Sequence, residues 1–160
     1  SCSAQTNAQV RDFIERGRPT FAVDPMRVAA GEDVAHEALA WARAHVGDKP
    51  LLIYSTATPD AVREVQSSLG AAAAGEMIES TLAAIAKGLV DLGVRRLVVA
   101  GGETSGAAVK ALGVTQLRIG PQIDPGVPWC YAQDAGVHLA LKSGNFGTAD
   151  FFTKAFEVLA

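Results

Sequence analysis

The chain contains 160 residues, the size of one ordinary domain, and its 49% of hydrophobic residues are enough to bury a sizeable core. Only 19% of the residues are charged and the formal net charge is -3, which argues against nonspecific nucleic-acid binding because that function needs a basic surface. No apolar run approaches the ~20 residues that span a bilayer, so neither a nucleic acid nor a membrane is an expected partner.

The predicted elements alternate between short apolar runs and longer segments with helical periodicity. The clearest helix lies near the middle of the chain, where Ile78, Leu82, Ile85, Leu89 and Leu92 fall on one face. In chain order, the expected helices cover residues 6–17, 32–46, 58–69, 76–92, 105–112 and 148–159. The expected strands cover residues 20–24, 51–54, 97–100, 117–119, 129–132 and 137–141.

Several helix ends carry local signals. Thr6 and Gln9 form a capping-box pattern, in which the Thr6 hydroxyl accepts the Gln9 N–H and the Gln9 side chain reaches back. Gly17 is a stop signal for this first helix. Thr58, which precedes a proline, and Thr148 are the expected N-caps of two later helices.

This order of elements predicts an α/β fold with three layers, in which helices flank a largely parallel sheet. The last two strands are separated by the short polar turn Gln133–Gly136, which predicts one antiparallel step near the C-terminus. The sequence shows no internal repeat and no low-complexity linker, so residues 1–160 are expected to form one domain. The chain starts at Ser1 rather than at Met, and we expect it to be a fragment of a longer protein.

The most informative segment is the apolar strand 97–100 and the glycine-rich turn after it. In a parallel α/β sheet, such a turn lies at the carboxyl end of a strand, where ligands bind. Glycines let a ligand approach the backbone, and the unpaired N–H groups and dipole of the next helix favour an anion. The candidate phosphate-binding residues are Gly101, Gly102, Glu103, Thr104, Ser105 and Gly106. The competing interpretation is a tight strand-to-helix turn in which the serine and threonine only cap the helix.

This turn follows neither of the common nucleotide-binding patterns. Gly101 and Gly106 have the spacing of a P-loop, but Ala107 and Ala108 stand where lysine and serine or threonine are needed. The G-x-G-x-x-G pattern does not follow the strand either, which disfavours a dehydrogenase-like dinucleotide domain.

A second glycine-rich turn follows the strand 137–141. Its candidate ligand-binding residues are Lys142, Gly144, Asn145 and Gly147. The lysine supplies a cation at a strand end, and the glycines permit unusual backbone angles around the asparagine. Two such turns in one domain support each other, because a pyrophosphate group is usually held from two sides. The alternative is a glycine loop with its lysine on the surface.

Ser1 and Ser3 are further candidates, since they lie directly before a helix. A strand would naturally precede them in a longer protein, and they would then occupy a strand-to-helix turn of their own.

Residues 119–129 contain three prolines and two glycines, which predicts a rigid extended loop. In a functional interpretation this loop forms a wall beside a ligand, and Ile123 or Trp129 packs on a flat group. In the structural interpretation, which we favour, Trp129 belongs to the core.

Signals for a metal site are weak. His36, His45 and His138 lack metal-site spacing and are interpreted as surface or packing residues. Two cysteines are too few for a disulfide framework and indicate reduced thiols of a cytoplasmic protein. Glu103 is a candidate for Mg²⁺ binding, directly or through water, or else an acid that is favourable at a helix N-terminus.

The motifs acquire more meaning from their order along the chain. The order is Ser-Cys-Ser at 1–3, Gly-Gly-Glu-Thr-Ser-Gly at 101–106, Ile-Gly-Pro-Gln-Ile-Asp-Pro-Gly-Val-Pro-Trp at 119–129, Lys-Ser-Gly-Asn-Phe-Gly at 142–147 and Asp-Phe-Phe at 150–152. This combination resembles the C-terminal nucleotide-binding domain of the four-carbon acid sugar kinases, the family of threonate, erythronate and 3-oxo-tetronate kinases. The likeness extends from Ser1 to about Phe156. Gln122 and Thr148-Ala149 differ from the residues that are commonest at these positions in the family. We do not interpret either difference as damaging to function.

The resemblance implies that phosphate is transferred from ATP to a hydroxyl of a small tetronic acid, with Mg²⁺ and backbone N–H groups holding the ATP tail. It implies that Ser1 or Ser3, residues 103–106 and residues 144–147 contact ATP or ADP, and that Lys142 offsets charge on the transferring phosphate. The sugar acid is expected to bind largely to a separate N-terminal domain, which this chain lacks. The catalytic base is therefore not assigned, and the fragment alone is expected to be inactive. A homodimer is a further expectation, compatible with the apolar helix near Ile85.

Two alternatives of other classes stay open. One is a nucleotide- or phosphosugar-binding module without chemistry of its own. The other is the dinucleotide-binding domain that the glycine spacing disfavours.

Overall fold

The computed structural model describes residues 3–55 and 59–159 of the chain. Its helices are α1 (Ala4–Glu15), α2 (Pro25–Ala29), α3 (Val34–His45), α4 (Pro59–Leu69), α5 (Ala71–Asp91), α6 (Gly102–Ala111) and α7 (Phe151–Val158). Its strands are β1 (Thr20–Ala22), β2 (Leu52–Tyr54), β3 (Arg96–Ala100), β4 (Arg118–Asp124), β5 (Val127–Ala132) and β6 (Val137–Lys142).

The strands form two sheets. β1 and β2 pair in parallel, with Phe21 opposite Ile53. The second sheet has the order β3-β6-β5-β4, in which β3 and β6 are parallel and the other two pairs are antiparallel. The expected α/β class, with helices flanking the sheets, is confirmed. The antiparallel part is larger than expected, because it comprises two strand pairs rather than one step.

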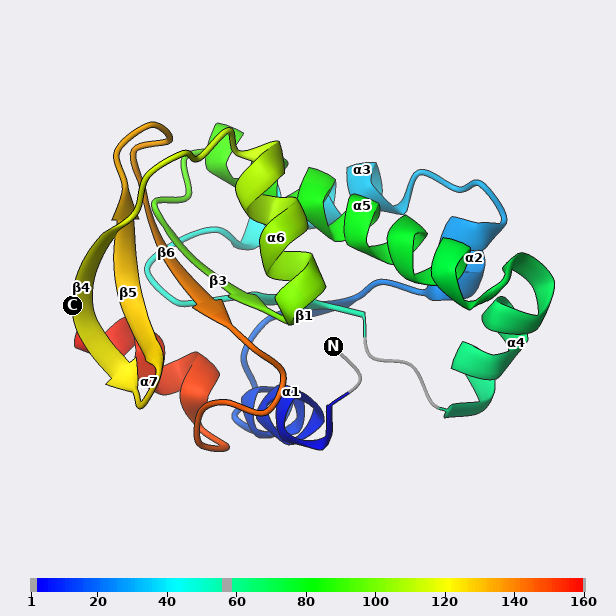
Figure 1. The fold of residues 1–160 in the computed structure, drawn as a ribbon, viewed down its shortest axis with the longest axis horizontal. Helices are drawn as coiled ribbons and strands as arrows, with labels where there is room; N and C mark the ends of the chain where they lie inside the picture. The colour runs from blue at the N-terminus through cyan, green and yellow to red at the C-terminus, as the bar shows by residue number, and fades with distance from the viewer. Residues whose placement is uncertain (1–2, 56–58, 160) are drawn as a thin grey trace.

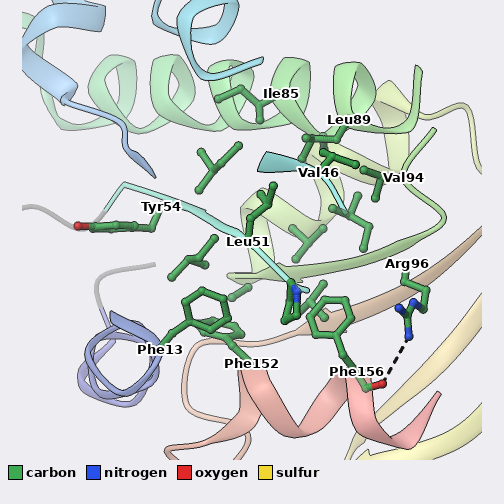
Figure 2. A pocket seen from close by; sticks show the side chains of 18 of the residues that line it. Phe13, Val46, Leu51, Tyr54, Ile85, Leu89, Val94, Arg96, Phe152 and Phe156 are labelled. Carbon is green, nitrogen blue, oxygen red and sulfur yellow. Dashed lines mark hydrogen bonds between the residues drawn. The ribbon is translucent and has the colours of Figure 1, made fainter. Parts of the chain in front are cut away.

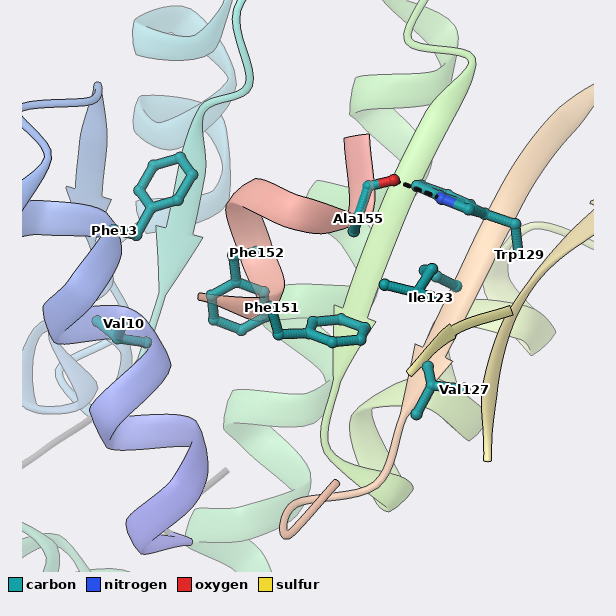
Figure 3. Close-up of a cluster of buried hydrophobic side chains, with 9 residues drawn as sticks. Val10, Phe13, Ile123, Val127, Trp129, Phe151, Phe152 and Ala155 are labelled. Carbon is teal, nitrogen blue, oxygen red and sulfur yellow. Dashed lines mark hydrogen bonds between the residues drawn. The ribbon is translucent and has the colours of Figure 1, made fainter. Parts of the chain in front are cut away.

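Helices cover both faces of the strands. α1 and α7 lie on one face, and α3, α5 and α6 lie on the other (Figure 1). A buried cluster on the first face includes Phe13, Trp129 and Phe151 (Figure 3). A second cluster, under α3 and α5, includes Ile85 and Leu89. The apolar side chains of the strands are therefore covered from both sides, as in a three-layer domain.

The longest helix, α5, confirms the expected apolar face, since Ile85 and Leu89 are buried. It begins at Ala71 rather than near residue 76, because the alanine run before it favours helix. Gly93, with φ of 100°, ends it in the left-handed region that glycine adopts readily. Gly17, with φ of 68°, follows α1 in the same way, as predicted.

Two predicted helix caps are wrong. Ser3 caps α1, and its Oγ accepts the Thr6 N–H at 3.1 Å, so the expected capping box does not form. Gln9 instead points across to a distant turn, as described below. At the last helix the N-cap position is Asp150 rather than Thr148. The predicted cap Thr58 lies outside the described residues.

The proline-rich segment is a hairpin rather than a loop. β4 and β5 pair across a turn that contains Gly126, with irregular register around Gln122. Hairpin pairing with β5 overrides the turn signals of the prolines, since shifts in register accommodate them. Trp129 is 0% exposed and its Nε1 donates to the Ala155 carbonyl at 2.7 Å, which confirms its core position (Figure 3).

Candidate functional site

The two glycine-rich turns lie side by side. Each follows one of two neighbouring parallel strands, because Ala100 at the end of β3 is opposite Lys142 at the end of β6. The Gly101 N–H donates to the Lys142 carbonyl at 2.7 Å. A Cβ added at Gly102 would lie 3.8 Å from the Ser143 Oγ. The two turns therefore form one surface at the carboxyl edge of the sheet, where α/β proteins bind ligands.

The first turn leads into the N-terminus of α6. Gly101 occupies the N-cap position with φ of 111°, and it has no side chain that could cap the helix. Among residues 3–55 and 59–159, no side chain is seen to accept from the first N–H groups of α6. Gly102 and Gly106 are exposed, and no atom lies within 4 Å of a Cβ added at Gly106. The backbone here is open to a ligand that accepts hydrogen bonds.

The predicted hydroxyls of this turn differ in their surroundings. Thr104 is half-buried at the edge of the site. Ser105 is 8% exposed, and its Oγ donates inward to the Val99 carbonyl at 3.4 Å. Ser105 therefore supports the junction between β3 and α6, and its side chain faces the protein rather than the open surface.

A second carboxylate accompanies Glu103. Glu79, on α5, is half-buried, and its pKa is raised by burial and then by the charge and hydrogen bond of Glu103. No local pattern in the sequence marked Glu79. It lies 24 positions before Glu103, on a helix for which an apolar face was the only predicted feature. Two carboxylates next to an uncapped helix form an oxygen-rich spot that a hard cation would neutralise.

α1 holds the second turn in place. Ser3 Oγ and Thr6 Oγ1 donate to the Gly144 carbonyl at 2.6 and 3.0 Å. Gln5 Nε2 donates to the Gly147 carbonyl at 2.5 Å. Gln9, which is 0% exposed, donates to the carbonyls of residues 146 and 148 at 3.0 and 2.9 Å. These hydrogen bonds fix the backbone of the second glycine turn and hold it in one conformation.

Gly147 is required by geometry at this place. Its φ is 84°, and a Cβ would lie 2.6 Å from Phe151 Cδ2 and 3.0 Å from Gln9 Nε2. Any other residue would be strained, and its Cβ would displace Phe151 first and crowd Gln9 as well.

Lys142 lies inside the site rather than on its surface. It is 0% exposed, and its Nζ donates to Thr6 Oγ1 at 3.1 Å and to the carbonyls of Ser143 and Gly144 at 2.9 Å. Burial lowers its pKa to about 8. No carboxylate in the described parts of the chain pairs with it. The alternative of a surface lysine is therefore wrong, and the ammonium holds the backbone of the turn.

A third support comes from the hairpin. Asp124 is 7% exposed and accepts from the Thr148 N–H at 3.0 Å and from Lys154 Nζ at 2.5 Å. The hydrogen bonds from Lys154 and Thr148 outweigh burial and lower its pKa. A Cβ at Gly126 would lie 2.7 Å from Phe146, so the hairpin turn contacts the second glycine turn directly. No local pattern marked Asp124, because its partners lie 24 and 30 positions away.

The structure brings most of the predicted site residues together. Residues 101–106 and 142–147 meet at one edge, and Ser3 joins them through Gly144. Asn145 is exposed there. Ser1 lies outside the described residues. Within residues 3–55 and 59–159, no group of three or more histidine, cysteine or acidic side chains is placed to hold a metal ion, and no helix combines the length and apolar character that crossing a membrane requires.

Comparison with known proteins gives consistent matches. A family model described as the nucleotide-binding C-terminal domain matches residues 1–152. A 3-oxo-tetronate kinase of Burkholderia multivorans is 59% identical over 99% of this chain and 37% of its own length. One of Pseudomonas fluorescens is 55% identical over 100% of this chain and 37% of its own length. A solved structure of a Haemophilus influenzae protein, 39% identical, superposes with a TM-score of 0.91 over 100% of this chain and 39% of that protein. The chain thus spans 37% of the length of these curated relatives.

Proposed function

The chain belongs to the family of nucleotide-binding C-terminal domains, and from this premise we propose that its two glycine turns bind the phosphates of ATP in a kinase acting on a four-carbon sugar acid. The observation that carries the proposal is the uncapped N-terminus of α6 beside a second turn on the neighbouring strand. The names of the relatives support the class of reaction and suggest 3-oxo-tetronate as the acid.

The backbone would supply most of the phosphate contacts. The first N–H groups of α6 point out of the helix and carry partial positive charge, which suits a polyphosphate. Gly102 leaves room for close approach, since a Cβ there would meet only the Ser143 Oγ at 3.8 Å within 4 Å. The exposed Asn145 lies on the opposite turn, where it would contact the same phosphates. This arrangement fits a chain with a net charge of -3, in which we expect backbone N–H groups rather than an excess of basic side chains to hold an anion.

Lys142 would act mainly by holding the backbone of the second glycine turn in place. Its ammonium is engaged with three oxygens beneath the turn, so it shapes the backbone on which the phosphates rest. Its charge also adds positive potential below the site in a region that excludes water, where electrostatic effects are strong.

The residues present also fit Mg²⁺, which ATP-dependent phosphoryl transfer uses. Glu103 and Glu79 supply carboxylate oxygens and Thr104 a hydroxyl, the donor types that this ion prefers. When bound, the ion would neutralise charge on the phosphates. Burial, and then the charge of Glu103, raise the pKa of Glu79, and a bound cation would favour the ionised form of both carboxylates.

The acceptor would bind largely outside this chain, in the other part of the longer protein. In the transfer, a hydroxyl oxygen of the acid forms a bond to the terminal phosphorus of ATP, the bond from that phosphorus to ADP breaks, and the hydroxyl proton passes to a base. The products are a phosphorylated acid and ADP. We place the base in the remaining part of the protein, and the reaction in the cytoplasm, where ATP is plentiful.

The test uses the full-length protein. Calorimetric titration with ATP, ADP and NAD measures nucleotide preference, and ADP release across a panel of four-carbon acids measures the reaction. Binding of ATP and ADP with ADP release on one acid supports the proposal. Binding of NAD without binding of ATP or ADP would overturn the proposal. Nucleotide binding without ADP release on any acid would instead favour the binding module.

A further inference from the structure

β2 and β3 each have an edge without a partner strand. Among the described residues β2 pairs with β1 and β3 pairs with β6, and neither is paired on its other side. Between these two edges lies a cavity of about 320 Å³. Figure 2 shows α5 above this cavity and α1 and α7 below it, so the cavity continues the middle layer of the domain.

The backbone of both strands is directed into this cavity. Leu52 donates to the Pro19 carbonyl, and Val23 donates to the Tyr54 carbonyl, so these β2 residues face β1. Alternate residues of a parallel ladder bond to the same neighbour, so the N–H and C=O of Ile53 face the cavity.

The same argument holds for β3. Arg95 and Gly101 bond to β6, so the intervening Val98 directs its N–H and C=O to the open edge. Helices cover both faces of these two strand edges, so the N–H and C=O groups that face the cavity require hydrogen-bond partners.

The middle of the cavity is apolar on both faces. Ile85 and Leu89 of α5 line one face, and Phe13, Phe152 and Phe156 line the other (Figure 2). Leu97 on β3 and Leu51 before β2 pack into the cluster under α5, while Val98 packs into the cluster under α1 and α7. A strand placed here would be buried on both sides, as strands of parallel sheets are.

The two edges run in the same direction. Val46 precedes β2 and Val94 precedes β3, and both lie at one end of the cavity (Figure 2). Tyr54, the last residue of β2, lies at the opposite end from Val94 and Arg96. The slot therefore suits one strand that is parallel to both neighbours.

The start of α1 lies at the far end of this slot. Ser3 bonds the Gly144 carbonyl, which follows β6, so α1 begins at the carboxyl edge of the sheet. Thr6, in the first turn of α1, lines the cavity together with Ser55 and Thr104. A parallel strand in the slot would end at this edge and would enter α1 directly.

We propose that the cavity receives a β-strand formed by the residues immediately before Ser1 in the longer protein, which pairs with β2 on one side and with β3 on the other. The matched relatives are longer than this chain, and the matching family is a C-terminal domain, so protein precedes this point. About five residues, the length of β3, fill the slot. Because both faces are covered, these residues are mostly apolar and β-branched.

The strand unites the two sheets into one with the order β1-β2-new strand-β3-β6-β5-β4. The connection from the new strand through α1 leads across the sheet to β1. The connection from β1 through α3 leads back across the sheet, in the opposite direction, to β2. Because α1 and α3 lie on opposite faces, both connections have the same handedness (Figure 1). This inference does not depend on nucleotide binding.

A crystal structure of the full-length protein decides the pairing. We expect β2 and β3 to be separated by two strand spacings, about 9.6 Å, with the residues before Ser1 between them. A direct pair at one spacing, about 4.8 Å, or a slot occupied by any other segment, overturns the proposal.

Amide hydrogen exchange on the same full-length protein tests the contribution of the strand. A proline about three residues before Ser1 removes a ladder N–H, and we expect protection at Ile53 and Val98 to fall together by roughly tenfold or more. The matched control is alanine at that position, which keeps the N–H and should retain most of the protection. Unchanged protection in the proline variant contradicts the proposal, and the crystal structure decides the question if that variant does not fold.

Discussion

Lys142 Nζ lies 3.1 Å from Thr6 Oγ1, although the two residues are 136 positions apart in the chain. Both side chains also bond the Gly144 carbonyl, at 2.9 and 3.0 Å, and Ser3 approaches the same oxygen at 2.6 Å. The second glycine turn is thus held by donors from α1 and from the end of its own strand. The shape of the candidate site depends on this small network.

Replacing Lys142 by methionine tests the network. Methionine keeps the apolar packing but leaves the carbonyls of Ser143 and Gly144 without this donor. We expect the free energy of unfolding to fall by about 1–3 kcal/mol and nucleotide affinity to fall roughly tenfold, because buried acceptors lose their partner and the turn shifts. Urea unfolding and calorimetry measure the two effects. The control is Lys110→Met, an exposed lysine on α6, and equal effects of both changes would contradict the assigned role.

The same lysine gives the protein a specific pH dependence. Burial lowers its pKa to about 8, from 10.5 for an ordinary lysine. Between these values the unfolded chain binds the proton more strongly than the folded one, so this lysine makes the free energy of unfolding rise with pH across that window. Below the window both states are protonated and the cost of burying the charge is complete. The rise should be smaller in Lys142→Met, as measured by urea unfolding at a series of pH values, and identical profiles would refute the assignment.

Gly102→Val tests the first turn directly. A Cβ at this position would meet only the Ser143 Oγ, at 3.8 Å, within 4 Å, so the fold should tolerate the change. The branched side chain would block the N-terminus of α6, and we expect the thermal stabilisation by ATP to disappear in the full-length protein. Gly47→Val is the matched control, since Gly47 is exposed and no atom lies within 4 Å of its added Cβ. Full ATP binding by Gly102→Val would show that the phosphates lie elsewhere.

Asp124→Asn tests the support from the hairpin. Asparagine can still accept from Thr148 but loses the ion pair with Lys154, and we expect a loss of about 1–3 kcal/mol in the free energy of unfolding at neutral pH. The pKa of Asp124 is lowered, so its contribution is present above the usual aspartate range near 3.8 and is lost as the pH falls through its folded value.

The two proteins should therefore converge in stability at acid pH, and a difference that persists there would contradict this explanation. Asp12→Asn, which removes the exposed pair with Arg16, is the control and should change the free energy of unfolding far less, because solvent screens exposed pairs.

Glu103→Gln tests the carboxylate pair. Removing the charge of Glu103 should bring the raised pKa of Glu79 closer to its ordinary value, as followed by NMR titration. The full-length enzyme should also need several-fold more Mg²⁺ for half-maximal ADP release, because one oxygen ligand is weakened. Glu64→Gln, on the exposed side of α4, should change neither quantity. If the pKa of Glu79 does not change in Glu103→Gln, the two carboxylates do not interact and the proposed pair is wrong.

The sequence was sufficient for the elements that depend on local patterns. The apolar runs that became β2, β3 and β6 were predicted within one residue at each end, and Gly17 marked the end of α1. The nearness of the two turns also followed from the pattern, since turns after parallel strands share one edge of a sheet. That inference needed β3 and β6 to be neighbours, and the structure confirms it.

The features that were missed depend on contacts between distant segments. Thr6 has a good capping pattern, but Ser3 takes that role, and Thr6 bonds Gly144 and Lys142 instead. Gln9 carries a capping-box signal that proves wrong, and Asp124 carries no local signal, because the partners of both lie far along the chain. Lys142 was predicted either as a cation of the site or as a surface lysine, and neither interpretation predicted its burial. The Thr6 hydroxyl and the two carbonyls that surround its ammonium come together only in the fold.

The bonds between α1 and the second turn join positions separated by up to 142 residues. Closing a loop of that length costs conformational entropy before any contact can offset it, so we expect these bonds to form late in folding. At the junction of β3 with α6, the bond from Ser105 to the Val99 carbonyl joins residues only six positions apart, although Gly101 also bonds Lys142 on β6. We therefore expect the local structure of the first turn to form earlier than the second turn, which needs the two ends of the chain to meet.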